Sequence, residues 1–230
     1  MKARDIAQLI DHSLLRPNLT LKDVKTGCLL AKEYDTASCC VRPADVKIAA
    51  ELLQGSSVAL STVIGFPHGT TTKQNKLAEC REAVLEGVVE LDVVMNFARL
   101  LSGDIQYVTE EIHEIVAVAH SEGAIVKVIL ETCYLNEKQK KEACRICREA
   151  GADFVKTSTG FGTKGAVISD LLLMQEAAGP NVKIKAAGGI RDLDAALAVH
   201  KAGAHRIGAT ATKVIMDEAI NREKAGTLIW

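Results

Sequence analysis

The 230-residue sequence predicts an α/β protein, a (β/α)8 TIM barrel formed by a single domain over residues 1–230. A repeated unit carries this prediction: an amphipathic helical segment, a glycine, and then a short β-rich run. Strands that alternate with helices in this way form a parallel sheet with right-handed crossovers. The length suits one α/β barrel, and no Pro/Gly/Ser-rich linker divides the chain.

The β-rich runs are the expected strands, and a glycine precedes four of them. Gly87, Gly123, Gly151 and Gly203 each stand between a helical segment and such a run. Glycine is favoured just past a helix end because it adopts the left-handed conformation that other residues resist. Seven strands are expected at residues 36–41, 57–64, 88–95, 125–131, 153–158, 182–187 and 204–208.

An eighth, short strand is a candidate at residues 9–12, after a short N-terminal helix, and it would close the barrel. With only seven strands, an open, doubly wound sheet is the alternative architecture. The barrel is favoured because no dinucleotide-binding fingerprint follows the first strand.

Amphipathic helices are expected between the strands. One face stays apolar across residues 105–119, as a helix packed on a sheet requires. Asn136 is expected to cap the helix that ends at Gly151.

Composition excludes several classes of function. The formal net charge is -1, which gives no electrostatic attraction to nucleic acid or to an anionic membrane surface. Neither a signal peptide nor a run of ~18 apolar residues is visible. Seven scattered cysteines are an odd number and do not suggest a disulfide framework. We therefore expect a cytoplasmic protein without nucleic-acid or membrane partners.

Strand alternation predicts which side chains point into the barrel, because successive residues face opposite sides of a strand. Apolar residues occupy one set of positions and suit the helix-facing side. The other set is mostly polar or charged, and it places the following side chains inside: Glu90, Asp92, Lys127, Glu131, Lys156, Lys183, Lys185 and Ala187. Cys40 shares its strand face with Thr36 and Ser38.

Four of these charged residues, Asp92, Lys127, Lys156 and Lys185, fall late in their strands. The carboxyl ends of the strands form the mouth where barrel active sites lie. Barrel interiors are normally packed with branched aliphatic side chains, and buried charge is costly unless it is paired. A structural salt-bridge network is the alternative reading, because such networks also perturb pKa values.

Two inward lysines on neighbouring strands predict Schiff-base chemistry. A lysine amine attacks a carbonyl only when unprotonated, and its ordinary pKa of ~10.4 leaves almost none in that form at neutral pH. A second cation nearby, together with desolvation, lowers that pKa. Asp92 can then carry protons, through a water, to and from the reacting atoms. Lys156, Lys185 and Asp92 therefore make an aldolase set.

Two glycine loops predict a phosphate site. Gly188-Gly189 follows the strand of Lys185 and leads into a helix, and Gly208-Ala209-Thr210 follows the last strand in the same way. Backbone N–H groups at helix N-termini bind phosphate, and the loops after strands seven and eight commonly do so in barrels. The segment beginning at Gly160 could add donors over the same mouth. A lone Gly-Gly is equally consistent with a tight turn.

No metal site is expected. The six histidines form no two-histidine motif of the metalloenzyme kind, so a metal-dependent aldolase mechanism is disfavoured. Cys144 and Cys147 lack a second ligand pair at zinc spacing.

Seven segments resemble deoxyribose-phosphate aldolase over nearly the whole chain. They are LIDHSLLRPNLT from Leu9, SCCVRP from Ser38, STVIGFPHG from Ser61, ELDVVMN from Glu90, KVILET from Lys127, FVKTSTGFG from Phe154 and KAAGGIR from Lys185. The last two, in this order and at about this spacing, are highly specific. The resemblance implies a cofactor-free, reversible cleavage of 2-deoxy-D-ribose 5-phosphate to D-glyceraldehyde 3-phosphate and acetaldehyde.

The resemblance also implies individual roles. Lys156 would form the Schiff base, Lys185 would tune it, and Asp92 would relay protons. The substrate would contact Cys40, Lys127, Thr159, Gly160, Gly188, Gly189, Gly208, Ala209 and Thr210. Homodimers or higher oligomers are usual in the family, so we expect a homodimer or homotetramer.

Three positions depart from the family pattern. Thr210 stands in a loop where the family commonly supplies serine, and its hydroxyl could substitute. Ala186 replaces a common Ser or Pro, and the chain ends at Trp230 without the C-terminal Tyr that some members use. Two other functions stay open: another Schiff-base phosphosugar aldolase or transaldolase-like barrel, and a non-catalytic phosphosugar-binding barrel.

Overall fold

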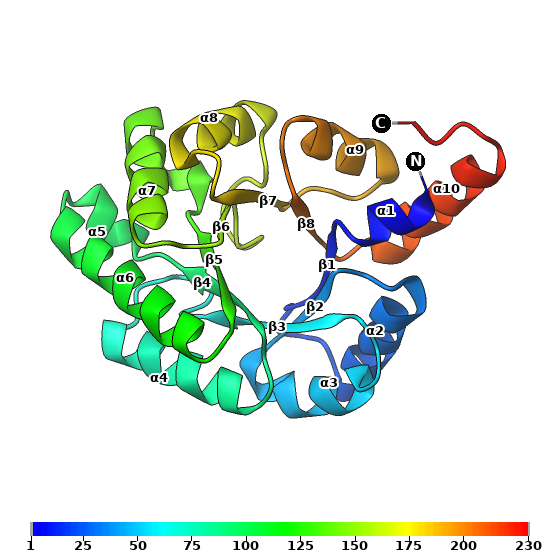
Figure 1. Ribbon diagram of the computed structural model, residues 1–230, viewed down its shortest axis with the longest axis horizontal. Coiled ribbons are helices and arrows are strands. Elements are labelled where there is room, and N and C mark those ends of the chain that lie inside the picture. The colour runs from blue at the N-terminus through cyan, green and yellow to red at the C-terminus, as the bar shows by residue number, and fades with distance from the viewer. Residues whose placement is uncertain (1, 230) are drawn as a thin grey trace.

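The computed structural model describes residues 2–229, in which eight parallel strands close into a barrel in chain order (Figure 1). The strands are β1 (Ile10–Leu14), β2 (Ser38–Val41), β3 (Ala59–Ile64), β4 (Glu90–Val94), β5 (Ile125–Ile129), β6 (Phe154–Lys156), β7 (Lys183–Ala187) and β8 (Arg206–Ala209). The predicted (β/α)8 barrel is confirmed. The candidate eighth strand is β1, which pairs with both β2 and β8 and thereby completes the ring.

Helices surround the barrel and separate successive strands (Figure 1). They are α1 (Ala3–Ala7), α2 (Leu21–Tyr34), α3 (Val46–Leu53), α4 (Lys73–Leu85), α5 (Phe97–Leu101), α6 (Ile105–Ser121), α7 (Glu137–Glu149), α8 (Ile168–Ala178), α9 (Leu193–Lys201) and α10 (Thr212–Lys224), with short 3-10 turns at Pro43–Asp45 and Thr132–Tyr134. The short helix α1 packs against α10, so the first and last helices lie on one side of the barrel.

Local sequence signals account for the helix ends. Gly87, Gly123, Gly151 and Gly203 all have positive φ values, between 77° and 100°, as their positions after helices predicted. Asn136 accepts a hydrogen bond from the backbone N–H of Gln139 and begins α7, so the predicted cap is confirmed.

The main hydrophobic core lies between the strands and the helices. Leu91, Val126 and Ile184 are fully buried in it, as their outward positions on the strands predicted. Helix α6 buries its predicted apolar stripe here, with Val108 and Ile112 inaccessible to solvent. No helix within residues 2–229 is long and apolar enough to cross a membrane.

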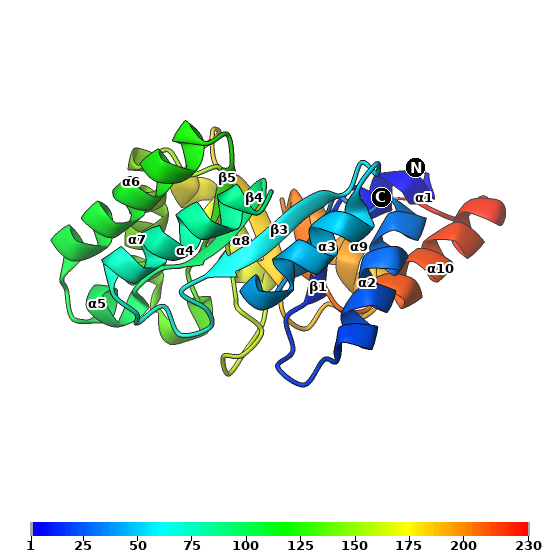
Figure 2. The same ribbon diagram turned by 90° about the horizontal axis from the view of Figure 1, so that it is seen from below.

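The polar side chains of the opposite strand face fill the inside of the barrel. Because the strands are parallel, their carboxyl ends open on one side of the ring. The loop after β1 and the loop between β6 and α8 both project from this side (Figure 2). The barrel therefore gathers charged strand residues beneath a rim of loops.

Candidate active site

A cavity of about 290 Å³ opens at the carboxyl ends of the strands. It is lined by eleven of the twelve residues that the sequence nominated: Cys40, Asp92, Lys156, Thr159, Gly160, Lys185, Gly188, Gly189, Gly208, Ala209 and Thr210. Residues not nominated complete the wall: Asp11, Ser13, Leu15, Arg16, Phe161, Ala187, Ile190 and Arg191.

Lys127 is the exception among the nominated residues. Its side chain is completely buried and does not line the cavity. It precedes the end of β5 by two residues, so its ammonium lies below the cavity floor among carboxylates. The expectation that Lys127 touches the substrate therefore needs correction, because its position is that of a support under Asp92.

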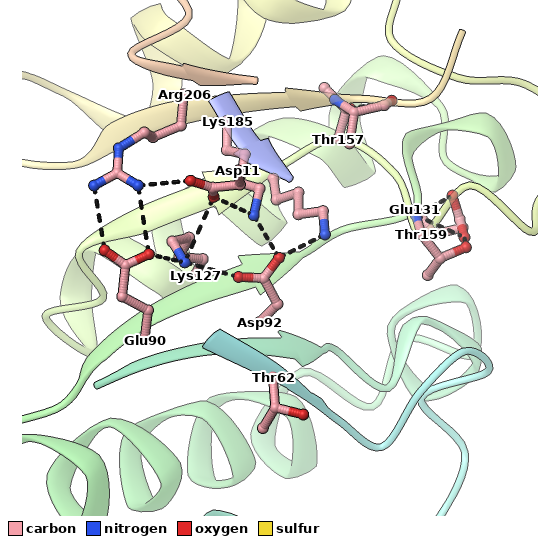
Figure 3. Close-up of polar contacts among 12 residues, drawn as sticks. Asp11, Thr62, Glu90, Asp92, Lys127, Glu131, Thr157, Thr159, Lys185 and Arg206 are labelled. Atoms are coloured by element: carbon pink, nitrogen blue, oxygen red, sulfur yellow. Dashed lines mark hydrogen bonds and ion pairs between the residues drawn. The ribbon is translucent and has the colours of Figure 1, made fainter. Parts of the chain in front are cut away.

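Asp92 stands at the centre of the site. One carboxylate oxygen, Oδ2, accepts hydrogen bonds from Lys156 Nζ and Lys185 Nζ, each at 2.6 Å. The other oxygen, Oδ1, accepts from Lys127 Nζ at 2.9 Å (Figure 3). The register explains this convergence: Asp92 is level with Lys127 across β4 and β5, and Lys156 is level with Lys185 across β6 and β7.

A second group of charges continues the network below the site. Asp11 Oδ2 lies 2.5 Å from Lys185 Nζ and 3.7 Å from Lys127 Nζ. Arg206 bridges Asp11 at 2.6 Å and Glu90 at 3.2 Å (Figure 3).

Sequence reasoning missed two members of this group. Asp11 falls in the one strand that was doubtful, and Arg206 was not assigned a facing direction. Treating β1 like the other strands would have found Asp11, because Ile10 and Leu14 form its apolar set.

The two lysines at the centre of the site have pKa values shifted in opposite directions: that of Lys156 is lowered and that of Lys185 is raised. Burial lowers the pKa of Lys156; Asp92 opposes this effect, and the positive charge of Lys185 adds to it. Burial also acts to lower the pKa of Lys185, but Asp11 and Asp92 outweigh it and raise that pKa above its ordinary value. Lys156 is thus the lysine that gives up its proton more readily.

Asp92 remains ionised in this setting. Burial favours its neutral form, yet Lys127, Lys156 and Lys185 together hold its pKa well below the usual range. Lys127 is itself held protonated, because three nearby carboxylates raise its pKa against the effect of burial.

Charge counting gives the same assignment. Three carboxylates (Asp11, Glu90 and Asp92) lie within ion-pair distance of Lys127, Lys185 and Arg206. These six groups balance one another, so the cluster is neutral when Lys156 carries no charge. Buried charge is stabilised only when it is paired. Lys156 is the seventh charged group and has no carboxylate left to balance it, so it is the one most easily deprotonated.

The loop after β6, which ends in Gly165, and the Gly188-Gly189 loop after β7 lie against each other beside this cluster. Both Gly188 and Gly189 have a φ of 85°, a left-handed conformation that favours glycine. A Cβ at Gly188 would approach Gly165 Cα to 2.8 Å, whereas a Cβ at Gly189 would meet no atom within 4 Å. Ala166 N–H donates to the Gly188 carbonyl at 3.1 Å, which joins the two loops. Gly189 is the one whose missing side chain leaves room in the cavity.

The remaining wall is apolar or held by hydrogen bonds. Leu15, Cys40 and Val63 form a small cluster separate from the main core, and burial raises the pKa of the Cys40 thiol to about 11. Thr159 is fixed from behind by Glu131, whose carboxylate accepts from its backbone N–H and its hydroxyl. Glu131, expected inside the barrel, instead holds this loop.

No group of three or more His, Cys, Asp or Glu side chains within residues 2–229 is arranged to hold a metal ion. The acidic groups of the site are bridged by lysine and arginine side chains instead.

Comparison with known proteins points to one family of aldolases. The model of the DeoC/LacD family aldolases matches residues 6–228. Deoxyribose-phosphate aldolase of Caldanaerobacter subterraneus is 49% identical over 215 residues, 93% of each chain. The enzyme of the same name from Thermococcus gammatolerans is 48% identical over 225 residues, 97% of this chain and 100% of that one.

The chain is also similar in fold to a solved structure of an aldolase. The tetrameric deoxyribose phosphate aldolase from Aeropyrum pernix superimposes with a TM-score of 0.88 at 35% identity, covering 94% of this chain and 92% of that one.

Proposed function

Because the chain belongs to the DeoC/LacD aldolase family, we propose that it is a class I aldolase that cleaves 2-deoxy-D-ribose 5-phosphate reversibly. The products are D-glyceraldehyde 3-phosphate and acetaldehyde. One observation carries the assignment: Lys156 lines the cavity, has a lowered pKa, and shares Asp92 Oδ2 with a second lysine.

Lys156 is the proposed nucleophile. Its neutral amine attacks the aldehyde carbon of the open-chain sugar, and the carbinolamine loses water to give a protonated Schiff base. Deprotonation of the 3-hydroxyl then breaks the bond between carbons 2 and 3, and D-glyceraldehyde 3-phosphate leaves. The electron pair moves onto the Schiff base as an enamine. Protonation at carbon 2 and hydrolysis release acetaldehyde and free Lys156.

Asp92 is the proposed proton-transfer group in these steps, and Lys185 is the proposed cation that keeps Lys156 neutral. Asp92 lies within hydrogen-bond distance of both amines, so it can exchange protons with the carbinolamine directly or through one water. Lys185 stays protonated and supplies the positive charge that favours neutral Lys156. Lys127, beneath the floor, is a positioning residue that holds the other oxygen of Asp92.

The glycine loops are the proposed phosphate site. Gly189, Gly208 and Thr210 line the cavity on the side of β7 and β8, where backbone N–H groups can meet an anion. Leu15 and Cys40, which cluster with Val63, form an apolar wall of the cavity on the side of β1 and β2. A hydrocarbon end, such as the two carbons of acetaldehyde, suits that wall.

Borohydride reduction in the presence of acetaldehyde tests the nucleophile. Reduction of the Schiff base should leave a two-carbon group on Lys156 and stoichiometrically on no other lysine, as peptide mass mapping would show. An adduct mainly on Lys127 or Lys185 would overturn the assignment. Lys156→Arg should abolish cleavage because a guanidinium stays protonated, whereas Lys201→Arg on exposed α9 should not.

The proposed function also carries expectations about cofactors, oligomeric state and cellular location. The protonated Schiff base accepts the electron pair of the breaking bond, so the reaction needs no metal or cofactor. We propose one barrel domain per chain and a homodimer or homotetramer, in line with the tetramer named for the Aeropyrum pernix relative. All seven cysteines are free thiols, which supports a cytoplasmic location.

A further inference from the structure

Two arginine side chains at the rim of the cavity, Arg16 and Arg191, have no hydrogen-bond or ion-pair partner within residues 2–229. Arg206 is bound to Asp11 and Glu90, and Arg42 is bound to Asp45 at 2.6 Å. Arg16 and Arg191 also line the cavity, yet neither guanidinium makes a hydrogen bond or ion pair within residues 2–229. An unpaired guanidinium that faces a cavity is available to an anionic ligand.

The backbone of Arg16 is held in place although its side chain is free. Its carbonyl accepts hydrogen bonds from Leu19 N–H and from the Arg42 guanidinium, each at 3.3 Å. Pro17 follows and restricts the conformation of Arg16 to extended backbone. This loop projects from the same side of the molecule as the loop after β6 (Figure 2), so Arg16 is presented to the cavity from a fixed position.

Arg16 lies next to the last phosphate loop. Strand β1 pairs directly with β8, and His12 on β1 is level with Ala209 on β8. The chain after β1 and the chain after β8 therefore leave the barrel side by side, and both Arg16 and Thr210 line the cavity. Arg191 also lines the cavity and follows Gly188-Gly189 on the loop after β7, the strand that pairs with the other edge of β8.

The distribution of charge in the site favours binding of a dianion at the cavity rim, beside Arg16 and Arg191. The buried cluster is neutral when Lys156 is uncharged, so it leaves no net attraction for a phosphate. The two free arginines add two uncompensated positive charges at the rim. A phosphate monoester carries about -1.5 to -2 charges at neutral pH, which this pair matches.

We propose that Arg16 binds the substrate phosphate across from Arg191 and selects for phosphorylated sugars. This inference deepens the proposed aldolase function and rests on it for the identity of the substrate. Arg16 supplies charge-assisted hydrogen bonds that the glycine loops, with their neutral backbone donors, do not.

Kinetics of Arg16→Gln test the proposal. The KM for 2-deoxyribose 5-phosphate should rise about tenfold or more, the value expected for loss of one hydrogen bond to a charged group. The KM for unphosphorylated 2-deoxyribose and the kcat for both sugars should change little. Arg16→Lys should restore part of the loss. Arg81→Gln, which removes an exposed arginine on α4, is the matched control and should behave as the wild type.

Binding of inorganic phosphate to the resting protein separates this inference from the reaction. Calorimetry should show weaker phosphate binding for Arg16→Gln than for Arg81→Gln, and the difference should shrink at high salt. If the wild type fails to cleave the sugar, the proposed function fails, and this measurement still decides the role of Arg16. Equal phosphate affinity in the two variants, or equal KM changes for both sugars, would overturn the inference.

Discussion

At the scale of single residues, one carboxylate oxygen serves two lysines that need opposite protonation states. Asp92 Oδ2 is 2.6 Å from both Lys156 and Lys185. Lys185 has a further carboxylate, Asp11, at 2.5 Å, whereas Lys156 has no second ion pair among residues 2–229. The proton therefore stays on Lys185, and the asymmetry of the two amines depends on Asp11 as much as on Asp92.

Replacement of Lys185 by leucine is expected to move the pH dependence of catalysis. Without the neighbouring cation, the pKa of Lys156 rises, because Lys185 is one of the causes that lower it. The acid limb of kcat/KM should shift to higher pH, and activity lost at neutral pH should partly return under alkaline conditions. A pH profile of Lys185→Leu measures this shift.

Thermal melting of the same variant distinguishes a purely structural role. If Lys185 only pairs with Asp11 and Asp92, its removal leaves buried carboxylates with fewer partners and lowers stability. Activity would then fall equally at every pH. An unmoved acid limb in a destabilised protein would refute the tuning role and leave Lys156 as the nucleophile.

Side-chain facing was the part of the site that the sequence predicted best. Period-two alternation predicts that Asp92, Lys156 and Lys185 point inside, and in the structure the Nζ atom of each lysine lies 2.6 Å from Asp92 Oδ2. Alternation failed for Glu131, because β5 ends at Ile129 and Glu131 takes a left-handed conformation with φ 52°. Beyond the end of a strand, the direction of a side chain depends on the conformation of the loop, and tertiary contacts determine that conformation.

At the scale of elements, the loops after β6 and β7 act as one unit. Gly165 and Gly188 touch so closely that a Cβ on Gly165 would lie 2.2 Å from the Gly188 carbonyl oxygen. The sequence nominated both loops, but it could not show that they are in contact, since that closeness depends on the closed barrel.

Gly189→Asp is expected to weaken binding of the phosphorylated sugar. The new carboxylate enters open space in the cavity and repels the phosphate. KM for 2-deoxyribose 5-phosphate should rise at least tenfold, the cost of about 1.4 kcal/mol, while KM for 2-deoxyribose should change much less. Steady-state kinetics with both sugars provide the measurement.

Gly55→Asp is the matched control for that substitution. Gly55 also has positive φ, at 73°, and a Cβ there also meets no atom within 4 Å, but it does not line the cavity. Both variants therefore place a side chain on a backbone with positive φ and add the same charge. Similar losses for the two sugars in Gly189→Asp would place the phosphate elsewhere and leave the loop a structural role.

At the scale of the whole molecule, a buried histidine joins the first strand to the last helix. His12 Nδ1 is hydrogen-bonded to Thr212 Oγ1 at 2.8 Å, and its other ring nitrogen is buried with no hydrogen-bond partner in the part of the chain that the structure describes. Burial lowers the pKa of His12 from 6.5 to about 4. Folding therefore favours the neutral ring.

Acid is expected to destabilise the protein through this residue. Between pH 6.5 and about 4 the unfolded chain binds a proton that folded His12 does not, so stability is present above this window and is lost as pH falls through it. The loss attributable to His12 is about 3 kcal/mol, at 1.36 kcal/mol per pKa unit. Urea unfolding at several pH values should show a shallower dependence in His12→Asn than in the wild type.

The same substitution at His113, an exposed residue of α6, controls for the change in residue type. Parallel stability curves for His12→Asn and the wild type would show that His12 is not responsible for the acid sensitivity.

The fold as a whole was predictable because its signals are local and repeated. Glycines at helix ends and apolar alternation mark seven of the strands, and closure then required only β1. Closure itself is a long-range property. It brings Asp11 to Arg206 across 195 positions of the chain, and no local pattern predicts that pair.

The buried charges are divided unevenly along the chain. Every carboxylate of the cluster comes from β1 or β4, and every cation comes from β5, β6, β7 or β8. Two fragments separated between β4 and β5 would thus present opposite charge on the surfaces that must meet, and would attract each other in a salt-dependent way. Two copies of either fragment would instead set like charges face to face. The two half-barrels are therefore expected to associate with each other, and neither is expected to form a dimer with a second copy of itself.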